Sequence, residues 1–192
     1  MQLPPPLPSV AVFDLDFTLW PLDVDCARTP FRSAASGALS ASGQRLNPYP
    51  EAPACLAYLF DSGVRIAYAS RTHDPDAAEA LLKLLPLPSQ RLGLTLWDAL
   101  EGDRGRFQAY PSRGGRAKTD HFAKIAEATG APFAEMVFFD DMGDNIECAE
   151  RQGTVSVLVH DGLTRSCLEK GLARWRAKRA ADGGGGGAKA RG

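Results

Sequence analysis

Two aspartates and a threonine occur at alternate positions directly after an apolar run near the start of the chain. The run, residues 10–13, contains no polar residue, and Asp14, Asp16 and Thr18 follow it. It predicts a buried parallel strand whose carboxyl end carries the acids, which is where open α/β sheets bind ligands. Two carboxylates there repel each other unless a cation or a shared proton offsets their charge. The spacing indicates chemistry; the alternative is a turn in which both acids only accept hydrogen bonds from loop amides.

Three further polar groups stand at comparable positions later in the chain. Ser70 follows a second apolar run, Asp140 and Asp141 end a third, and Lys118 lies at the start of a predicted helix. Because the carboxyl ends of parallel strands share one edge of a sheet, we expect these groups to converge with Asp14. Oxygen-only acids suit a hard cation such as Mg²⁺, whereas lysine and a hydroxyl suit a phosphoryl group. Together they predict a phosphate-and-magnesium site.

The segments that must position these groups alternate between strand-like and helix-like patterns. Buried strands are predicted at residues 10–13, 64–69, 136–141 and 155–159, with short strands at 94–97 and 107–110. Helices are predicted at residues 51–63, 76–85, 119–129 and 144–151, and a last one from about Thr164 that turns Leu168, Leu172 and Trp175 inward. The alternation predicts an α/β fold, a three-layer, doubly wound, mostly parallel sheet.

Two intervals show no sustained period. Residues 21–50 are rich in Pro, Ser, Gly and Ala and predict an irregular flap over the site, and residues 87–116 are interrupted by Gly, Arg and Pro. Neither interval is long enough for a large lid, so we expect a minimal or absent cap domain and an open site. The predicted organisation is a flexible N-terminus (1–9), one domain (10–180) and a disordered Gly-rich tail (181–192).

Composition narrows the function classes. The 192 residues and 44% hydrophobic content are typical of one packed domain. The formal charge of −1 argues against electrostatic binding of nucleic acid. No apolar stretch approaches the roughly 20 residues that span a bilayer, and the first residues lack a secretory signal. We expect a cytoplasmic protein with reduced, scattered cysteines, no nucleic-acid or membrane partner, and phosphorylated small molecules or phosphoproteins as partners.

The ordered motifs resemble those of the haloacid dehalogenase superfamily. Its four motifs match, in order, residues 14–18, Ser70, Lys118 and residues 140–141. Within this superfamily, the amino-acid sequence of residues 11–21 and 132–141 resembles that of the magnesium-dependent phosphatase 1 family. The resemblance extends from Val10 to about Trp175.

The resemblance implies roles for the principal residues. Asp14 attacks phosphorus and forms an aspartyl-phosphate, and Asp16 protonates the leaving oxygen. Mg²⁺ is held by Asp14, the backbone carbonyl of Asp16, and Asp141. Ser70 and Lys118 bind the phosphoryl oxygens, with Lys118 contributing most as charge spreads in the transition state.

The resemblance implies roles for further residues. Arg71 adds a contact to the phosphoryl group, Thr18 orders the catalytic loop, and Asn145 orients Asp141. Asp140 either acts through water or positions the loop.

The implied activity is a magnesium-dependent phosphomonoesterase acting on phosphotyrosine in proteins, on sugar phosphates including fructosamine-6-phosphate-type glycation products, or on both. Two alternatives abandon catalysis: a silent phosphate-binding module, and a receiver-like signalling domain, which has a lone phosphoacceptor aspartate on the strand where this chain has Ser70. A phosphomutase is a further alternative, but it requires a closing cap that excludes water, and no such cap is evident in the sequence.

Several side chains near the motifs have two readings. We expect Phe17 and Trp20 to pack beside the first strand; the alternative is substrate stacking. His73 is a candidate substrate contact. Arginines between the second and third motifs either bind the acidic flanks of a phosphoprotein or belong to a surface insertion, which we favour: Arg104, Arg106, Arg113 and Arg116.

Overall fold

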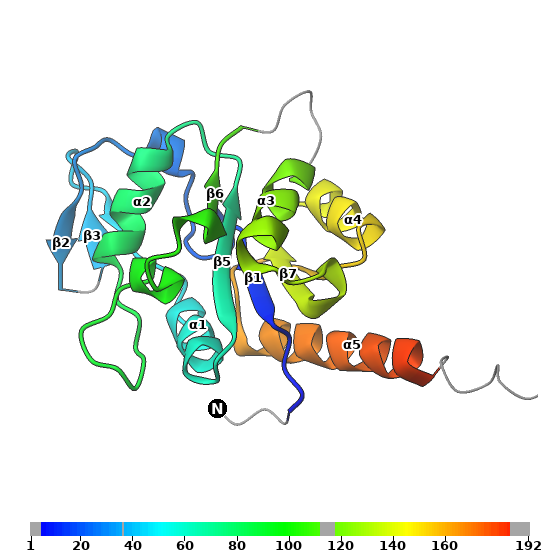
Figure 1. Cartoon of the computed structure of the whole chain (residues 1–192). Coiled ribbons are helices and arrows are strands. Elements are labelled where there is room, and N and C mark those ends of the chain that lie inside the picture. The colour runs from blue at the N-terminus through cyan, green and yellow to red at the C-terminus, as the bar shows by residue number, and fades with distance from the viewer. Residues whose placement is uncertain (1–4, 36, 112–117, 185–192) are drawn as a thin grey trace, which may run out of the picture.

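The fold is built on a parallel sheet of five strands in the order β6-β5-β1-β7-β8 (Figure 1). The structure is a computed structural model and describes residues 5–35, 37–111 and 118–184. Its strands are β1 (Val10–Phe13), β5 (Arg65–Ser70), β6 (Phe107–Ala109), β7 (Met136–Asp140) and β8 (Val155–Leu158). All neighbouring pairs are parallel. Because β1 lies at the centre, the residues that follow it reach groups from both sides of the sheet.

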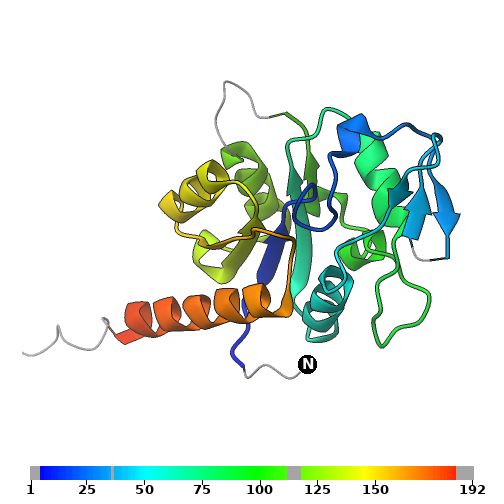
Figure 2. The ribbon, with the colours of Figure 1, turned by 180° about the vertical axis from the view of Figure 1, so that it is seen from behind.

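Helices cover both faces of this sheet, as Figures 1 and 2 show from opposite sides. They are α1 (Ala52–Asp61), α2 (Pro75–Leu84), α3 (Thr119–Thr129), α4 (Gly143–Arg151) and α5 (Arg165–Gly184). Ala11 and Phe13 of β1 belong to the core that includes α1 and α5, whereas Val10 and Val12 belong to the core under α3 and α4. This alternation follows from the two-residue period of a strand. The predicted three-layer, doubly wound architecture is confirmed.

The interval predicted as an irregular flap contains a small antiparallel sheet. Its strands are β2 (Arg32–Ala34), β3 (Gly37–Leu39) and β4 (Arg45–Leu46), and they lie beside α2 (Figure 1). Ala38 and Leu46 are fully buried in the main core. Strands of two or three residues carry too little alternation for the sequence to reveal them, and burial of these two side chains explains why they form.

The region before Lys118 is more regular than its composition suggests. Residues 97–100 form a 3-10 helix, η2 (Trp97–Leu100), so the strand predicted at 94–97 is wrong; Thr95 makes only an isolated bridge to Pro86. A second 3-10 helix, η3 (Arg104–Arg106), leads directly into β6, which confirms the strand predicted from 107. Residues 112–117 lie outside the described part.

Helix α5 begins within one residue of the predicted start and extends beyond the predicted end. Leu168, Leu172 and Trp175 are buried as expected. The helix continues through Gly184, so residues 181–184 are helical, contrary to the predicted tail; residues 185–192 lie outside the described part. At the other end, the Ser9 amide donates to the Glu135 carbonyl at 3.0 Å, which joins the N-terminal segment to the turn before β7.

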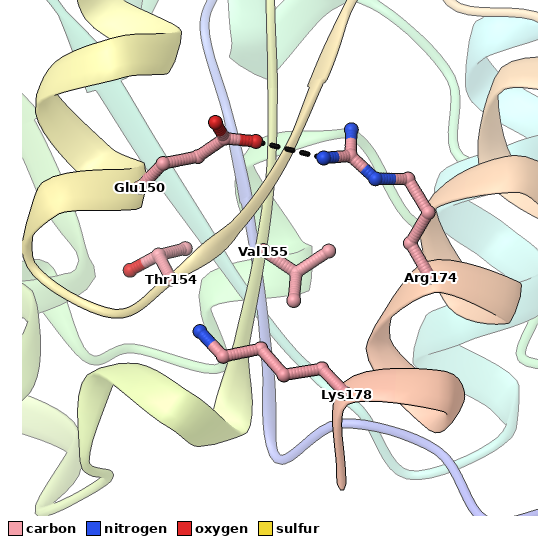
Figure 3. Close-up of a pocket in the computed structure, with 5 residues that line it drawn as sticks. All are labelled: Glu150, Thr154, Val155, Arg174 and Lys178. Atoms are coloured by element: carbon pink, nitrogen blue, oxygen red, sulfur yellow. Dashed lines mark hydrogen bonds and ion pairs between the residues drawn. The ribbon is translucent and has the colours of Figure 1, made fainter. Parts of the chain in front are cut away.

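Side chains of α5 cover the open edge of the sheet at β8. In the described ranges β8 pairs with β7 alone, so alternate carbonyls along it face away from the sheet. Arg174 donates to the Ser156 carbonyl at 2.5 Å, and Lys178 donates to the Gly153 carbonyl at 2.6 Å. Both side chains line a pocket, drawn in Figure 3, whose volume is about 240 Å³. Charged side chains placed in this way oppose pairing with another chain.

No helix within the described ranges has the length and apolar character that crossing a bilayer requires. None of the four cysteines, all of which lie in the described ranges, forms a disulfide bond.

Candidate active site

Three charged side chains meet where β1 and β7 end. Asp14 follows β1, Asp140 ends β7, and Lys118 immediately precedes α3. The ammonium of Lys118 donates to Oδ1 of Asp14 and to Oδ2 of Asp140, the latter at 2.5 Å. The exposed fractions of the three residues are only 7%, 1% and 0% for Asp14, Lys118 and Asp140. The predicted convergence of these motifs is confirmed.

Asp140 is held by hydrogen bonds on both of its carboxylate oxygens. Oδ1 accepts from the Met142 amide at 2.7 Å and from Nδ2 of Asn145 at 2.9 Å. Oδ2 accepts from Lys118 and from the same Asn145 nitrogen at 3.0 Å. Asn145 therefore orients Asp140 and not Asp141, which corrects the predicted role: the first turn of α4 brings residue 145 back over the end of β7.

The acids form a group that fits a cation. Ligand oxygens of Asp14, Asp140 and Asp141 lie within 4.8 Å of one another. Burial raises the pKa of Asp14, the Asp140 charge adds to this effect, and Lys118 opposes it. Burial and the Asp140 charge likewise raise the pKa of Asp141. The single positive charge of Lys118 does not balance three carboxyl groups, and all the ligand atoms in this group are oxygens. The arrangement therefore suits a hard divalent cation such as Mg²⁺.

Asp16 occupies a less buried position on the loop after β1. Its Oδ1 accepts from the indole N–H of Trp20 at 2.6 Å and from the Val24 amide at 3.1 Å. Burial raises the pKa of Asp16 to about 6, although these hydrogen bonds oppose the shift. A carboxyl group with that pKa exchanges a proton near neutral pH, as a general acid must.

The loop that carries both acids is held in an uncommon backbone conformation. Phe17 has φ = 56° and a side chain that is 45% exposed, so its predicted packing beside the strand is wrong. Trp20 is fully buried, as predicted. Thr18 is buried, and its hydroxyl donates to Oδ2 of Asp14 at 3.5 Å, in keeping with the role predicted for it.

Ser70 and Arg71 lie at the end of β5, on the other side of β1 from Asp140. Ser70 is buried and its Oγ accepts from the Thr72 amide at 3.2 Å. The Arg71 guanidinium donates to the sulfur of Met142 at 2.8 Å. Because β1 lies between β5 and β7, this contact carries the Arg71 side chain across the end of β1.

Two residues not selected from the sequence contact this site. His121 is buried, and its Nε2 lies 2.9 Å from the Ser70 carbonyl and 3.0 Å from the Tyr110 carbonyl. Burial lowers the pKa of His121 to about 4, so the neutral ring donates from Nε2. Its position in the first turn of the helix that Lys118 precedes is a usable signal. Asp25 contacts the loop after Ser70 from 47 residues away, and no local pattern indicates that contact.

Other candidate residues have structural partners. His73 is exposed and lies 3.2 Å from Asp25. Arg104 pairs with Glu79 at 2.6 Å on the surface. Arg106 is only 3% exposed and donates to the Ile66 carbonyl at 3.2 Å, so the surface reading of this residue is wrong. Arg113 and Arg116 lie outside the described residues.

The pocket beside α5 contains none of the candidate catalytic residues. It is lined by Glu150, Thr154, Val155, Arg174 and Lys178 (Figure 3). Thr154 and Val155 stand at the amino end of β8, whereas Asp14 and Asp140 stand at the carboxyl ends of their strands.

Comparison with known proteins agrees with this geometry. The model of a family described as acid phosphatase matches residues 6–178. The chain belongs to this family. Human magnesium-dependent phosphatase 1 is 34% identical over 168 residues, covering 86% of each chain. A HAD-like hydrolase superfamily protein of Schizosaccharomyces pombe is 35% identical over 150 residues, covering 76% of this chain and 82% of that protein. The predicted membership of the haloacid dehalogenase superfamily and its magnesium-dependent phosphatase 1 family is confirmed.

Solved structures support the fold. CbbY from Rhodobacter sphaeroides, in complex with phosphate, aligns with a TM-score of 0.57 at 14% identity, covering 83% of this chain and 89% of that one. Membership of the family makes this chain a phosphatase of the haloacid dehalogenase type.

Proposed function

We propose that the protein is a magnesium-dependent phosphomonoesterase that acts through an aspartyl-phosphate on Asp14. The observation that carries the proposal is the pairing of buried Asp14 with Lys118 beside two further acids. A carboxylate that is only 7% exposed at the end of the central strand is oriented as a nucleophile and shielded from bulk water. The similarity to human magnesium-dependent phosphatase 1 supports the choice of reaction and metal.

In the first step an oxygen of Asp14 forms a bond to phosphorus as the ester P–O bond breaks. The departing oxygen takes the proton of Asp16, whose pKa of about 6 lets part of the protein carry that proton near neutral pH. In the second step Asp16 accepts a proton from a water molecule, whose oxygen bonds to phosphorus while the bond to Asp14 breaks. Inorganic phosphate leaves, and both aspartates return to their starting states.

Lys118 and Ser70 bind the phosphoryl oxygens, and Arg71 closes over them. Lys118 supplies a buried positive charge for the charge that spreads over these oxygens. Ser70 accepts a hydrogen bond from Thr72, so its own proton is directed to another acceptor.

The proposed ligands of Mg²⁺ are Asp14, Asp141 and the backbone carbonyl of Asp16. Asp141 is preferred to Asp140 because both oxygens of Asp140 already accept hydrogen bonds from Lys118, Asn145 or Met142. When bound, the ion offsets the repulsion between the anionic nucleophile and the anionic substrate.

The rim of the site favours aryl phosphates, such as phosphotyrosine, over sugar phosphates. Phe17 and Met142 are 45% and 41% exposed, and both lie in loops at the catalytic edge. Phe17 directly follows Asp16, the group that protonates the leaving oxygen, so the leaving group lies next to this ring. An aromatic ring gains from contact with Phe17 and the Met142 thioether, whereas a hydroxylated sugar does not.

Phosphate release from para-nitrophenyl phosphate, a phosphotyrosine peptide and a hexose phosphate tests the proposal. We expect activity with Mg²⁺ that is abolished by chelation and by Asp14→Asn, and a higher kcat/KM for the aryl esters. Activity that survives in the Asp14→Asn variant would contradict the mechanism. A wild-type protein that binds phosphate without hydrolysing any of these esters is instead a binding module.

A further inference from the structure

A short turn in the segment between β1 and the small sheet contacts both halves of the active site. This turn is the 3-10 helix η1 (Val24–Cys26). The Val24 amide donates to Oδ1 of Asp16, the proposed proton donor, at 3.1 Å. The next residue, Asp25, directs its carboxylate to the loop that follows Ser70. One turn therefore connects the loop after β1 to the loop after β5.

Asp25 accepts hydrogen bonds from three consecutive residues of that loop. Its Oδ1 accepts from the Thr72 hydroxyl and from the amides of His73 and Asp74, each of the latter at 3.1 Å. Its Oδ2 accepts from the His73 amide at 3.0 Å and lies 3.2 Å from the His73 ring. These bonds outweigh the effect of partial burial and lower the pKa of Asp25, so the group is ionised at neutral pH. A charged acceptor of this kind makes strong hydrogen bonds.

The loop held by Asp25 in turn orients Ser70. The Thr72 amide donates to Oγ of Ser70 at 3.2 Å, while the Thr72 hydroxyl donates to Asp25. Asp74 accepts from the Ala77 amide at 2.9 Å and so caps α2, which fixes the far end of the same loop. Thr72 is thus held by Asp25. Its amide is a fixed donor to Oγ of Ser70, so the hydroxyl proton of Ser70 points to another acceptor.

We propose that Asp25 is a positioning residue: through Thr72 it fixes the Ser70 hydroxyl at the phosphoryl group, from a turn whose Val24 amide also binds Asp16. The inference rests on the proposed function, in which Ser70 binds the phosphoryl oxygens and Asp16 moves the proton. Asp25 does not touch the reacting atoms, so its effect passes through Ser70.

The chain offers a matched control in Asp61. Its Oδ1 accepts from the Ser89 hydroxyl at 2.6 Å and its Oδ2 accepts from the Gln90 amide at 3.0 Å. This contact also joins a carboxylate to a distant loop, but it lies at the end of α1 and the loop after α2, away from the catalytic residues. Asp61→Ala removes comparable hydrogen bonds without touching the active site.

The test measures kcat and KM for para-nitrophenyl phosphate in Asp25→Ala, Asp25→Asn and Asp61→Ala, and combines Asp25→Ala with Ser70→Ala. We expect Asp25→Ala to lower kcat/KM about tenfold or more, Asp25→Asn to recover part of that loss, and Asp61→Ala to change it less than about twofold. In the Ser70→Ala background we expect Asp25→Ala to cost less than about twofold. Full additivity of the two substitutions, or an equal loss in Asp61→Ala, would overturn the proposal.

Amide hydrogen exchange supplies a readout that does not depend on turnover. We expect Thr72 and His73 to exchange faster in Asp25→Ala, and at the wild-type rate in Asp61→Ala. Unchanged exchange at these amides overturns the proposal even if activity falls. An inactive wild-type protein refutes the proposed function, whereas an active wild type whose Asp25→Ala variant matches it refutes this inference alone.

Discussion

The ammonium of Lys118 lies 2.5 Å from Oδ2 of Asp140 and also donates to the carboxylate of Asp14. One lysine thus joins the residue after the central strand to the last residue of a neighbouring strand, in a region that side chains almost fully cover. Without Lys118, two buried carboxyl groups face each other. In the proposed mechanism the same charge also faces a phosphoryl group that arrives next to Asp14, so we expect the lysine to serve both the folded state and the reaction.

Lys118→Met tests this double role. We expect kcat to fall about 100-fold to 1,000-fold, because a buried charge on the phosphoryl oxygens is lost. We also expect the free energy of unfolding at pH 7 to fall by about 3 kcal/mol or more, because an uncompensated buried charge remains. Kinetics and urea unfolding measure the two effects. Lys83→Met, which removes a surface pair with Glu79, is the control, and a Lys118→Met variant as active as this control would contradict the assignment.

We expect Asp141 to bind the metal ion and Asp140 to stabilise the fold. In Asp141→Asn the Mg²⁺ concentration that gives half-maximal activity rises about tenfold or more, because a charged ligand is replaced by a neutral one. In Asp140→Asn the main loss is in stability, because Lys118 and Asn145 lose the carboxylate that they share. Magnesium titrations and urea unfolding of both variants separate the effects. The reverse pattern would identify Asp140 as the metal ligand.

His121 makes stability depend on pH. Its pKa in the folded protein is about 4, below the ordinary value of 6.5, so the unfolded chain takes up the proton first as pH falls. The stabilisation is complete above pH 6.5 and declines towards pH 4, by a total on the order of 3 kcal/mol. His121→Gln removes this contribution, and the difference between the two unfolding profiles isolates it from the carboxyl groups. An exposed histidine, His160, provides the control variant. Parallel profiles for wild type and His121→Gln would refute the prediction.

We expect Phe17 to set the proposed preference for aryl leaving groups. Covering the exposed half of this ring contributes about 1 kcal/mol, so Phe17→Ala lowers kcat/KM for a phosphotyrosine peptide by about five- to tenfold. The value for a hexose phosphate changes little, because that leaving group makes no comparable apolar contact. The ratio of the two kcat/KM values is the measurement. Leu92→Ala, which alters a 94% exposed side chain in the loop after α2, leaves the ratio unchanged. An equal loss with both substrates would show that Phe17 acts on the loop and not on the leaving group.

Arg174 protects the open edge of β8. Arg174→Met removes its bonds to the Ser156 carbonyl and to Glu150, and we expect a loss of about 1 kcal/mol in unfolding free energy and more self-association. Denaturant unfolding and sedimentation velocity measure these effects. Arg151→Met removes an exposed pair with Glu147 within one helix and is the control. A variant as stable and as monodisperse as the control would contradict the protective role.

The sequence by itself determined the fold class and the principal site residues. The reason is that the signals are local: an apolar run marks a buried strand, and a polar residue directly after it must stand at the edge where such sheets bind ligands. Asp14, Ser70 and Asp140 are each read from a few neighbouring residues. Lys118 is likewise read from the helix that it precedes.

Only the tertiary structure decided which of these groups touch. Asn145 bonds to Asp140 because the first turn of α4 folds back over β7, and Asp25 reaches the loop after Ser70 from 47 residues away. Arg106, which we predicted to lie on the surface, is buried, and backbone carbonyls accept hydrogen bonds from its guanidinium. Phe17 is exposed, on a loop whose backbone has a positive φ at this residue. These outcomes depend on distant partners and on backbone geometry, and local residue patterns contain neither.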